Sequence, residues 1–210
     1  MADSAPQDGD FFVHYLDSRE QGLLVTPLFT DIVSNGGATN ICPEAIPKIA
    51  RHLYEHPEGV SPRMTPRGQQ GFAQDQSEDL SFFCNVAKSC DNFVEATGKV
   101  GDVYLMHPLM LHAPSSNALR RVRIIINPVV SLREPHRFDR EDPGEYSLVE
   151  RFTLRALGKE RLEGWKATGP RETVVPARLR AQEKMRQEEL KRLAELKAAA
   201  EGQQAVSAAA

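Results

Sequence analysis

The sequence predicts a mainly β domain with flanking helices and a helical C-terminal tail, on three observations. Apolar residues alternate over 100–105 and again over 122–126, with the period of a strand that has two unlike faces. The APSSN run between these segments consists of turn formers, which favours a short hairpin loop after His112. A charged run over 180–200 is typical of a solvated helix.

The elements of the first half are expected in the following order. Residues 11–32 supply the first strands, and the Asn-Gly-Gly run at 35–37 turns the chain. A helix follows over 43–55, where apolar residues recur at helical spacing after a proline. The polar segment 61–79 is rich in Pro, Gly, Arg and Gln and predicts a loop. The sequence of this loop is equally consistent with a substrate lid and with plain surface disorder.

The second half contains two further helices. Apolar residues resume near Phe82, and the chain re-enters the sheet ahead of Gly101. A helix is predicted over 147–157, and the charged helix ends in an Ala-rich tail. We therefore expect one domain over 1–178 and a separate helical tail over 179–210.

Composition excludes several classes of function. A chain of 210 residues with 40% hydrophobic content can bury one sizeable core. Its 26 basic and 29 acidic residues are mixed and give a net charge of -3, which argues against nucleic-acid binding. We find no apolar run near the roughly 20 residues that a membrane helix requires. Three cysteines at unrelated spacings form neither a disulfide framework nor a zinc pattern, so we expect a reducing, cytoplasmic location.

His112 and Arg123 are the candidate functional residues of the two alternating segments. Histidine is a common metal ligand, and the guanidinium fork of arginine suits a carboxylate. If the two residues lie on neighbouring antiparallel strands, roughly 5 Å apart, a small acid bound by Arg123 could reach a metal bound by His112. Each has an ordinary alternative reading, since a strand histidine is more often a hydrogen-bonded core residue and a strand arginine often pairs with a surface carboxylate.

The whole string GDVYLMHPLMLHAPSSNALRRVR, over 101–123, is more specific. It resembles the phytanoyl-CoA dioxygenase family of iron(II)- and 2-oxoglutarate-dependent oxygenases, and in particular its fungal members. That family carries G-D-x-x-x-x-H-P-x-x-x-H, followed by an asparagine and an arginine. The resemblance implies that His112 is an iron ligand, that Asn117 is the loop asparagine, and that Arg123 pairs with the distal carboxylate of 2-oxoglutarate.

The sequence N-terminal to this string also resembles that family. The run starting at DGDFFVHYLD resembles the segment with the H-x-D pair, so Asp8 matches the carboxylate ligand. NGGATNICPEAI resembles the N-G-x-T motif, which implies that Thr39 contributes to cofactor binding. Pro6 stands where the family has its first histidine, which leaves Asp8 and His112 as metal ligands instead of three. A shortened N-terminus or a loss of the chemistry explains this departure, and we favour the shortened N-terminus, which could also have carried a targeting signal.

The resemblance implies a double-stranded β-helix, a jelly-roll or cupin-like barrel, with helices packed outside. It also implies Fe(2+) as cofactor, 2-oxoglutarate as co-substrate, and O2 as the oxidant of a small organic substrate. The expected reaction is hydroxylation or desaturation, and fungal members often act in secondary metabolism. Nothing in the sequence indicates a site for coenzyme A or for an acyl chain.

Two other functions remain open. A catalytically impaired barrel could bind a small acid through Arg123, or a protein partner through the C-terminal helix. A cupin isomerase ranks last, because it requires a close cluster of two histidines and a carboxylate. Of the remaining histidines, His14 is expected to be a half-buried polar strand residue, and His107 a structural neighbour of the site. The His52/His56 pair is expected to lie on a solvated helical face.

Overall fold

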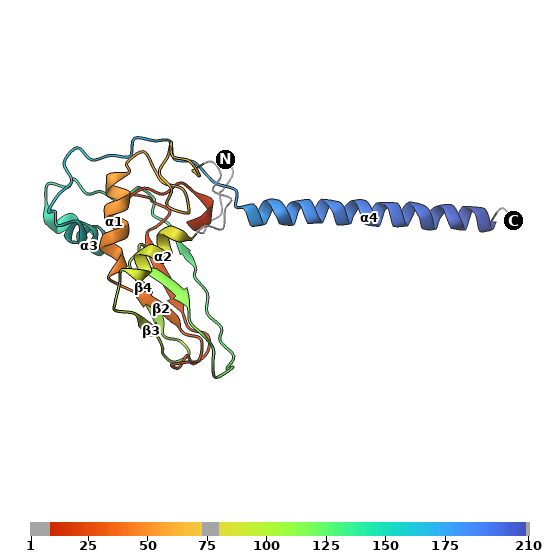
Figure 1. Cartoon of the computed structure of the whole chain (residues 1–210), viewed down its shortest axis with the longest axis horizontal. Helices are drawn as coiled ribbons and strands as arrows, with labels where there is room; N and C mark the ends of the chain where they lie inside the picture. Colours follow the sequence, from red (N-terminus) through yellow and green to blue (C-terminus); the bar gives the residue numbers. More distant parts are fainter. Residues whose placement is uncertain (1–8, 73–79, 209–210) are drawn as a thin grey trace. The chain divides into compact units, whose positions relative to one another are not determined.

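The computed structural model describes residues 9–72 and 80–208 (Figure 1). The chain divides into two units, Met1–Thr173 and Val174–Ala210. The second unit contains the 32-residue helix α4 (Ala177–Ala208), which has more residues than the strands of the described chain together. The prediction of a mainly β chain is therefore corrected to two sheets with more helix than strand. No helix in the described part combines the length and apolar character needed to cross a bilayer.

The first sheet is antiparallel and has the order β4-β1-β6. Its central strand β1 (Leu23–Pro27) pairs with β4 (Val103–Met106) on one side and with β6 (Val129–Val130) on the other. β4 shows the predicted alternation of its side chains between two faces. However, the face that carries the apolar residues Val103 and Leu105 is exposed. On the opposite face of β4, Tyr104 packs against Leu28, Ile32 and Ala38, and Met106 is buried.

The second sheet has the order β3-β2-β5 and is also antiparallel. β2 (Thr39–Cys42) is central, with β3 (Val94–Ala96) on one side and β5 (Leu111–Pro114) on the other. Successive strands alternate between the two sheets, except that β2 and β3 belong to the same one. In the order β3-β2-β5, β5 is an edge strand, and it carries His112.

A small apolar cluster is formed by residues that flank the strands of the two sheets. Leu28 and Ile32, which follow β1, and Ala38, which precedes β2, are almost completely buried there. Tyr104 of β4 and Ile125 pack against them. Ile125 therefore packs against the same buried residues as Tyr104 of β4.

The pairing predicted for residues 122–126 is wrong. Instead of forming a hairpin with β5, this segment runs beside the end of β1, where Ile125 bridges Leu28 and the Phe29 N–H donates to the Ile124 carbonyl. The reason is that the loop after β5 does not fold back. Its backbone bonds to the turn before β2, as in the Leu119 N–H bond to the Asn35 carbonyl, and the chain crosses to the other sheet.

Three helices complete the first unit. α1 (Ala45–Glu55) and α3 (Leu148–Leu157) confirm the helices predicted over 43–55 and 147–157, and α2 (Ser81–Lys88) occupies the apolar segment near Phe82. α1 packs against both other helices (Figure 1). Its buried face consists of the residues that gave the helical period: Ala45, Ile46, Ile49, Ala50 and Leu53.

A capping box begins α3. The Ser147 hydroxyl accepts from the Glu150 N–H, and the Glu150 carboxylate accepts from the Ser147 N–H. Glu150 is nearly buried and also accepts from the Arg137 N–H at 2.6 Å, with the Arg140 guanidinium 3.4 Å away. Burial alone would raise the pKa of this carboxyl, but the N–H donors and Arg140 outweigh burial and lower the pKa.

Replacing Glu150 by alanine is expected to lower the free energy of unfolding by about 2–4 kcal/mol, because buried N–H donors lose their acceptor. Since the folded-state pKa of Glu150 is lowered, its contribution is present above the unfolded-state pKa and is lost as the pH falls through the folded-state pKa. Urea unfolding at neutral and acidic pH measures both effects. Glu160→Ala, at an exposed position, is the control, and equal losses for the two variants would contradict this role.

Candidate functional site

His112 lies on the edge strand β5, directly opposite Ile41 of β2. The side chain is exposed, and its Nδ1 is 2.9 Å from the Met110 carbonyl oxygen. Because a carbonyl only accepts, Nδ1 carries the proton and Nε2 keeps its lone pair. This is the arrangement in which metal-bound histidines are usually held.

A cavity of about 510 Å³ adjoins this strand, and we call it the His112 cavity. Its size is in the range of small-molecule sites. Most of its wall is apolar and comes from β5, from α2 and from the segment 62–64. The polar residues that line it are Asp10, His14, Gln21, Asn40, Arg63 and His112.

His14 is the most deeply buried of these polar residues. Its Nε2 donates to the Gly9 carbonyl at 2.7 Å, whereas its buried Nδ1 has no hydrogen-bond partner among the described residues. Burial lowers the pKa of His14, so the ring is neutral and Nδ1 is an acceptor. The backbone pairs with Val60, which confirms a strand-like structural setting, but the expectation of half-burial is wrong.

Asp10 and Arg63 add an ion pair at the same cavity. The Arg63 guanidinium lies 3.0 Å from the Asp10 carboxylate, and both side chains are about three-quarters buried. Arg63 belongs to the predicted loop 61–79, of which the structure describes residues 61–72. This part is packed, since Ser61 and Met64 are buried and the Ser61 N–H bonds to Thr65.

The proposed carboxylate ligand, Asp8, lies outside the described residues. The residue after it, Gly9, lines the same cavity as His112. Around His112, the described part of the chain does not gather three metal-ligating atoms within 4.8 Å of one another. His112 is therefore the one predicted iron ligand whose surroundings the structure shows.

Asn117 and Arg123 lie together, but apart from the His112 cavity lining. The Asn117 side chain closes its own loop by bonding to the backbone N–H and carbonyl of Arg121. Gly37 has φ +79°, and a Cβ on it would stand 3.0 Å from Asn117 Cβ and 3.4 Å from Arg123 Cδ. A glycine is required at this contact between the two turns.

Arg123 is half-buried and forms no ion pair with any carboxylate that the structure describes. It does not lie on a strand next to β5, so the predicted His112–Arg123 strand pair is wrong. Thr39 is buried on β2 opposite Pro114, two residues from the Ile41–His112 pair. By strand alternation, Thr39 and His112 share one face of the second sheet.

The other histidines have structural partners. His107 Nε2 donates to the Thr153 hydroxyl at 3.0 Å, and its Nδ1 accepts from the Leu109 N–H. Burial lowers the pKa of His107 to about 4, so it is neutral at physiological pH. His52 bonds to the Met64 carbonyl and His56 to the Glu58 carboxylate. Both side chains are partly buried, so the solvated helical face expected for this pair is wrong.

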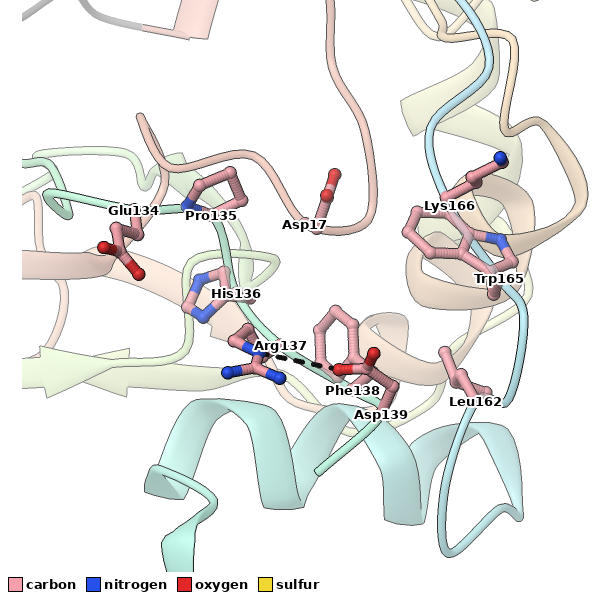
Figure 2. Close-up of a pocket in the computed structure, with 10 residues that line it drawn as sticks. All are labelled: Asp17, Glu134, Pro135, His136, Arg137, Phe138, Asp139, Leu162, Trp165 and Lys166. Atoms are coloured by element: carbon pink, nitrogen blue, oxygen red, sulfur yellow. Dashed lines mark ion pairs between the residues drawn. The ribbon is translucent and has the colours of Figure 1, made fainter. Parts of the chain in front are cut away.

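A second cavity, of about 340 Å³, lies elsewhere in the first unit and contains no predicted site residue; we call it the Trp165 cavity. Figure 2 shows Asp17 and the rings of Phe138 and Trp165 around it. Its charges are largely paired, since Asp17 binds Arg171 at 2.6 Å and Arg137 lies 3.6 Å from Asp139. It therefore offers little unbalanced charge to a ligand.

Sequence reasoning missed Asp10, His14 and Arg63 as neighbours of His112. The run FFVHYLD contained one signal, because a histidine flanked by large apolar residues is often buried and needs hydrogen-bond partners. Comparison with known proteins adds no assignment: no protein-family model, curated protein or solved structure matches this chain.

Proposed function

We propose that this chain is an iron(II)- and 2-oxoglutarate-dependent dioxygenase that hydroxylates or desaturates a small organic substrate. The observation that carries the proposal is His112, whose Nδ1 is fixed by a backbone carbonyl and whose ring lines a mostly apolar cavity of about 510 Å³. A nitrogen ligand at the wall of such a cavity suits a metal that acts on an apolar substrate.

The strand order supports a jelly-roll scaffold for this function. Strands that alternate between two antiparallel sheets are the arrangement expected of a double-stranded β-helix. The packing of Ile125, two residues after Arg123, against a buried apolar cluster and the contact of Gly37 with Arg123 support an inward orientation of the arginine. We propose this architecture for the first unit.

In this proposal His112 Nε2 and the Asp8 carboxylate hold the iron. The bound metal supplies oxygen activation coupled to decarboxylation of 2-oxoglutarate. Arg123 binds the distal carboxylate of the co-substrate through its guanidinium fork, with Thr39 and Asn117 shaping the surroundings. The apolar wall of the His112 cavity seats the substrate and excludes water.

Anaerobic calorimetry with iron(II)-loaded protein tests the proposal. We expect one 2-oxoglutarate to bind per chain, with at least about tenfold higher affinity than glutarate, which has the same carboxylates but cannot chelate through a 2-oxo group. Omission of iron should remove this preference. Equal binding of the two acids would contradict the proposal and favour the impaired barrel that holds a small acid through Arg123.

A further inference from the structure

A second group of ligating atoms lies outside the site described above. Cys42 Sγ, Cys90 Sγ and a Glu44 carboxylate oxygen all lie within 4.8 Å of one another. Cys42 ends β2, Glu44 immediately precedes α1, and Cys90 follows the end of α2. Both cysteines are buried free thiols, whereas Cys84 is exposed.

We propose that Cys42, Cys90 and Glu44 form a binding site for a thiophilic divalent cation such as zinc, with a fourth position for water. In a tetrahedral site with Zn–S bonds of about 2.3 Å, ligand atoms lie about 3.7 Å apart. Because the three ligand atoms all lie within 4.8 Å of one another, each pair needs to approach by at most about 1 Å to reach that geometry.

The surroundings of the three ligands support ion binding. The Glu44 carboxylate is oriented by the Asp91 N–H at 2.8 Å and by the backbone and side-chain amides of Asn92. The neighbouring backbone N–H groups of Glu44 and Ala45 act to lower the pKa of the Cys42 thiol and so favour its thiolate form. Such contacts to ligand atoms are typical of protein metal sites, where they fix the ligand geometry.

Lys48 balances the charge of the site. Its Nζ lies 3.4 Å from Cys90 Sγ and 2.7 Å from the Ser89 hydroxyl. Two thiolates and one carboxylate carry three negative charges, of which a divalent cation neutralises two and the Lys48 ammonium the third. A site of this composition is therefore electrically neutral when the ion is bound.

Binding must release protons. Without an ion, burial together with the neighbouring Cys90 raises the pKa of the Cys42 thiol, although the backbone N–H groups oppose this effect. Each thiol loses its proton as its sulfur bonds to the ion, so two protons are released for each ion bound and no electron is transferred. The bound ion would tie the β2–α1 junction to the end of α2.

Cobalt(II) titration of the full chain, under anaerobic and reducing conditions, tests this site. We expect one equivalent of cobalt to give thiolate-to-cobalt charge-transfer absorption, which zinc then removes by displacement. Cys42→Ser and Cys90→Ser should each abolish the absorption, and Glu44→Gln should weaken binding at least about tenfold. Cys84→Ser and His112→Ala should retain the band, which separates this site from the proposed iron site.

Thiol alkylation of the wild-type protein provides a test that does not depend on the folding of variants. Zinc should protect Cys42 and Cys90 from alkylation while Cys84 reacts at an unchanged rate, and a chelator should reverse the protection. Unchanged reactivity of all three thiols would overturn the proposal. So would a Cys42–Cys90 disulfide that forms under mild oxidation of protein that takes up no metal.

Discussion

His112→Ala is expected to lower the iron(II) affinity of the protein by about 100-fold or more. Its Nδ1 is committed to the Met110 carbonyl, and its Nε2 is the metal ligand in the proposed site. Alanine removes this nitrogen and leaves the cavity wall without a metal-binding group at β5. Anaerobic competition with a chromogenic chelator measures the affinity directly.

His56→Ala is the matched control for this substitution. His56 pairs with the Glu58 carboxylate and does not line the His112 cavity, so its loss should leave iron binding unchanged. Exposed His112 contributes little to the core, and circular dichroism should show the same fold for both variants. Iron affinity that is unaffected by His112→Ala would remove His112 from the site.

Arg123→Ala is expected to weaken 2-oxoglutarate binding by about 30-fold or more, which corresponds to about 2 kcal/mol at the least. The half-buried guanidinium has no carboxylate partner in the described part of the chain and is available to the acid. Arg123→Lys should not restore the affinity, because an ammonium cannot form the two parallel hydrogen bonds of the fork. Calorimetry with iron-loaded protein checks both variants.

Arg121→Ala controls for the removal of one positive charge from the same loop. The Arg121 side chain is exposed, and the loop is held by its backbone groups, which alanine retains. Binding of 2-oxoglutarate should therefore remain within about twofold of wild type. A similar loss in both arginine variants would indicate general electrostatic attraction and would contradict a specific role for Arg123.

Local patterns in the sequence predicted the helices correctly. The periods of α1 and α3 depend on residues three and four apart, and the Ser147–Glu150 capping box also lies within one helical turn. The strands β4 and β5 were also predicted from local features, namely the alternation of apolar residues and the turn-forming residues between the two extended segments. Helix content was underestimated because the length of α4 was underestimated: it starts at Ala177 and extends to Ala208.

Long-range pairing was not predictable in the same way. Alternation indicates that residues 122–126 are extended, but it does not identify their neighbour, and this segment lies beside the end of β1. The alternation also did not reveal that the apolar face containing Leu105 is exposed. Both outcomes depend on contacts between segments far apart in the chain.

In the candidate site too, local patterns were predictable from the sequence and long-range contacts were not. His112 was identified from a local motif, and the structure places it at a cavity of suitable size. His14 joins that cavity from a distant segment, and the local pattern around it did not indicate this. The cysteines of the proposed cation site have no metal-ligand spacing in sequence, and the fold alone brings Cys42 and Cys90 together.

The most direct test of the proposed function is the visible absorption of the anaerobic protein with iron(II) and 2-oxoglutarate. Chelation of the metal by the 2-oxo acid gives a weak charge-transfer band that neither component gives alone. We expect this band with the wild-type chain, and we expect its loss in His112→Ala and in Arg123→Ala at matched concentrations. Absence of the band at millimolar iron and 2-oxoglutarate, or its persistence in His112→Ala, would contradict an iron(II)/2-oxoglutarate site at His112.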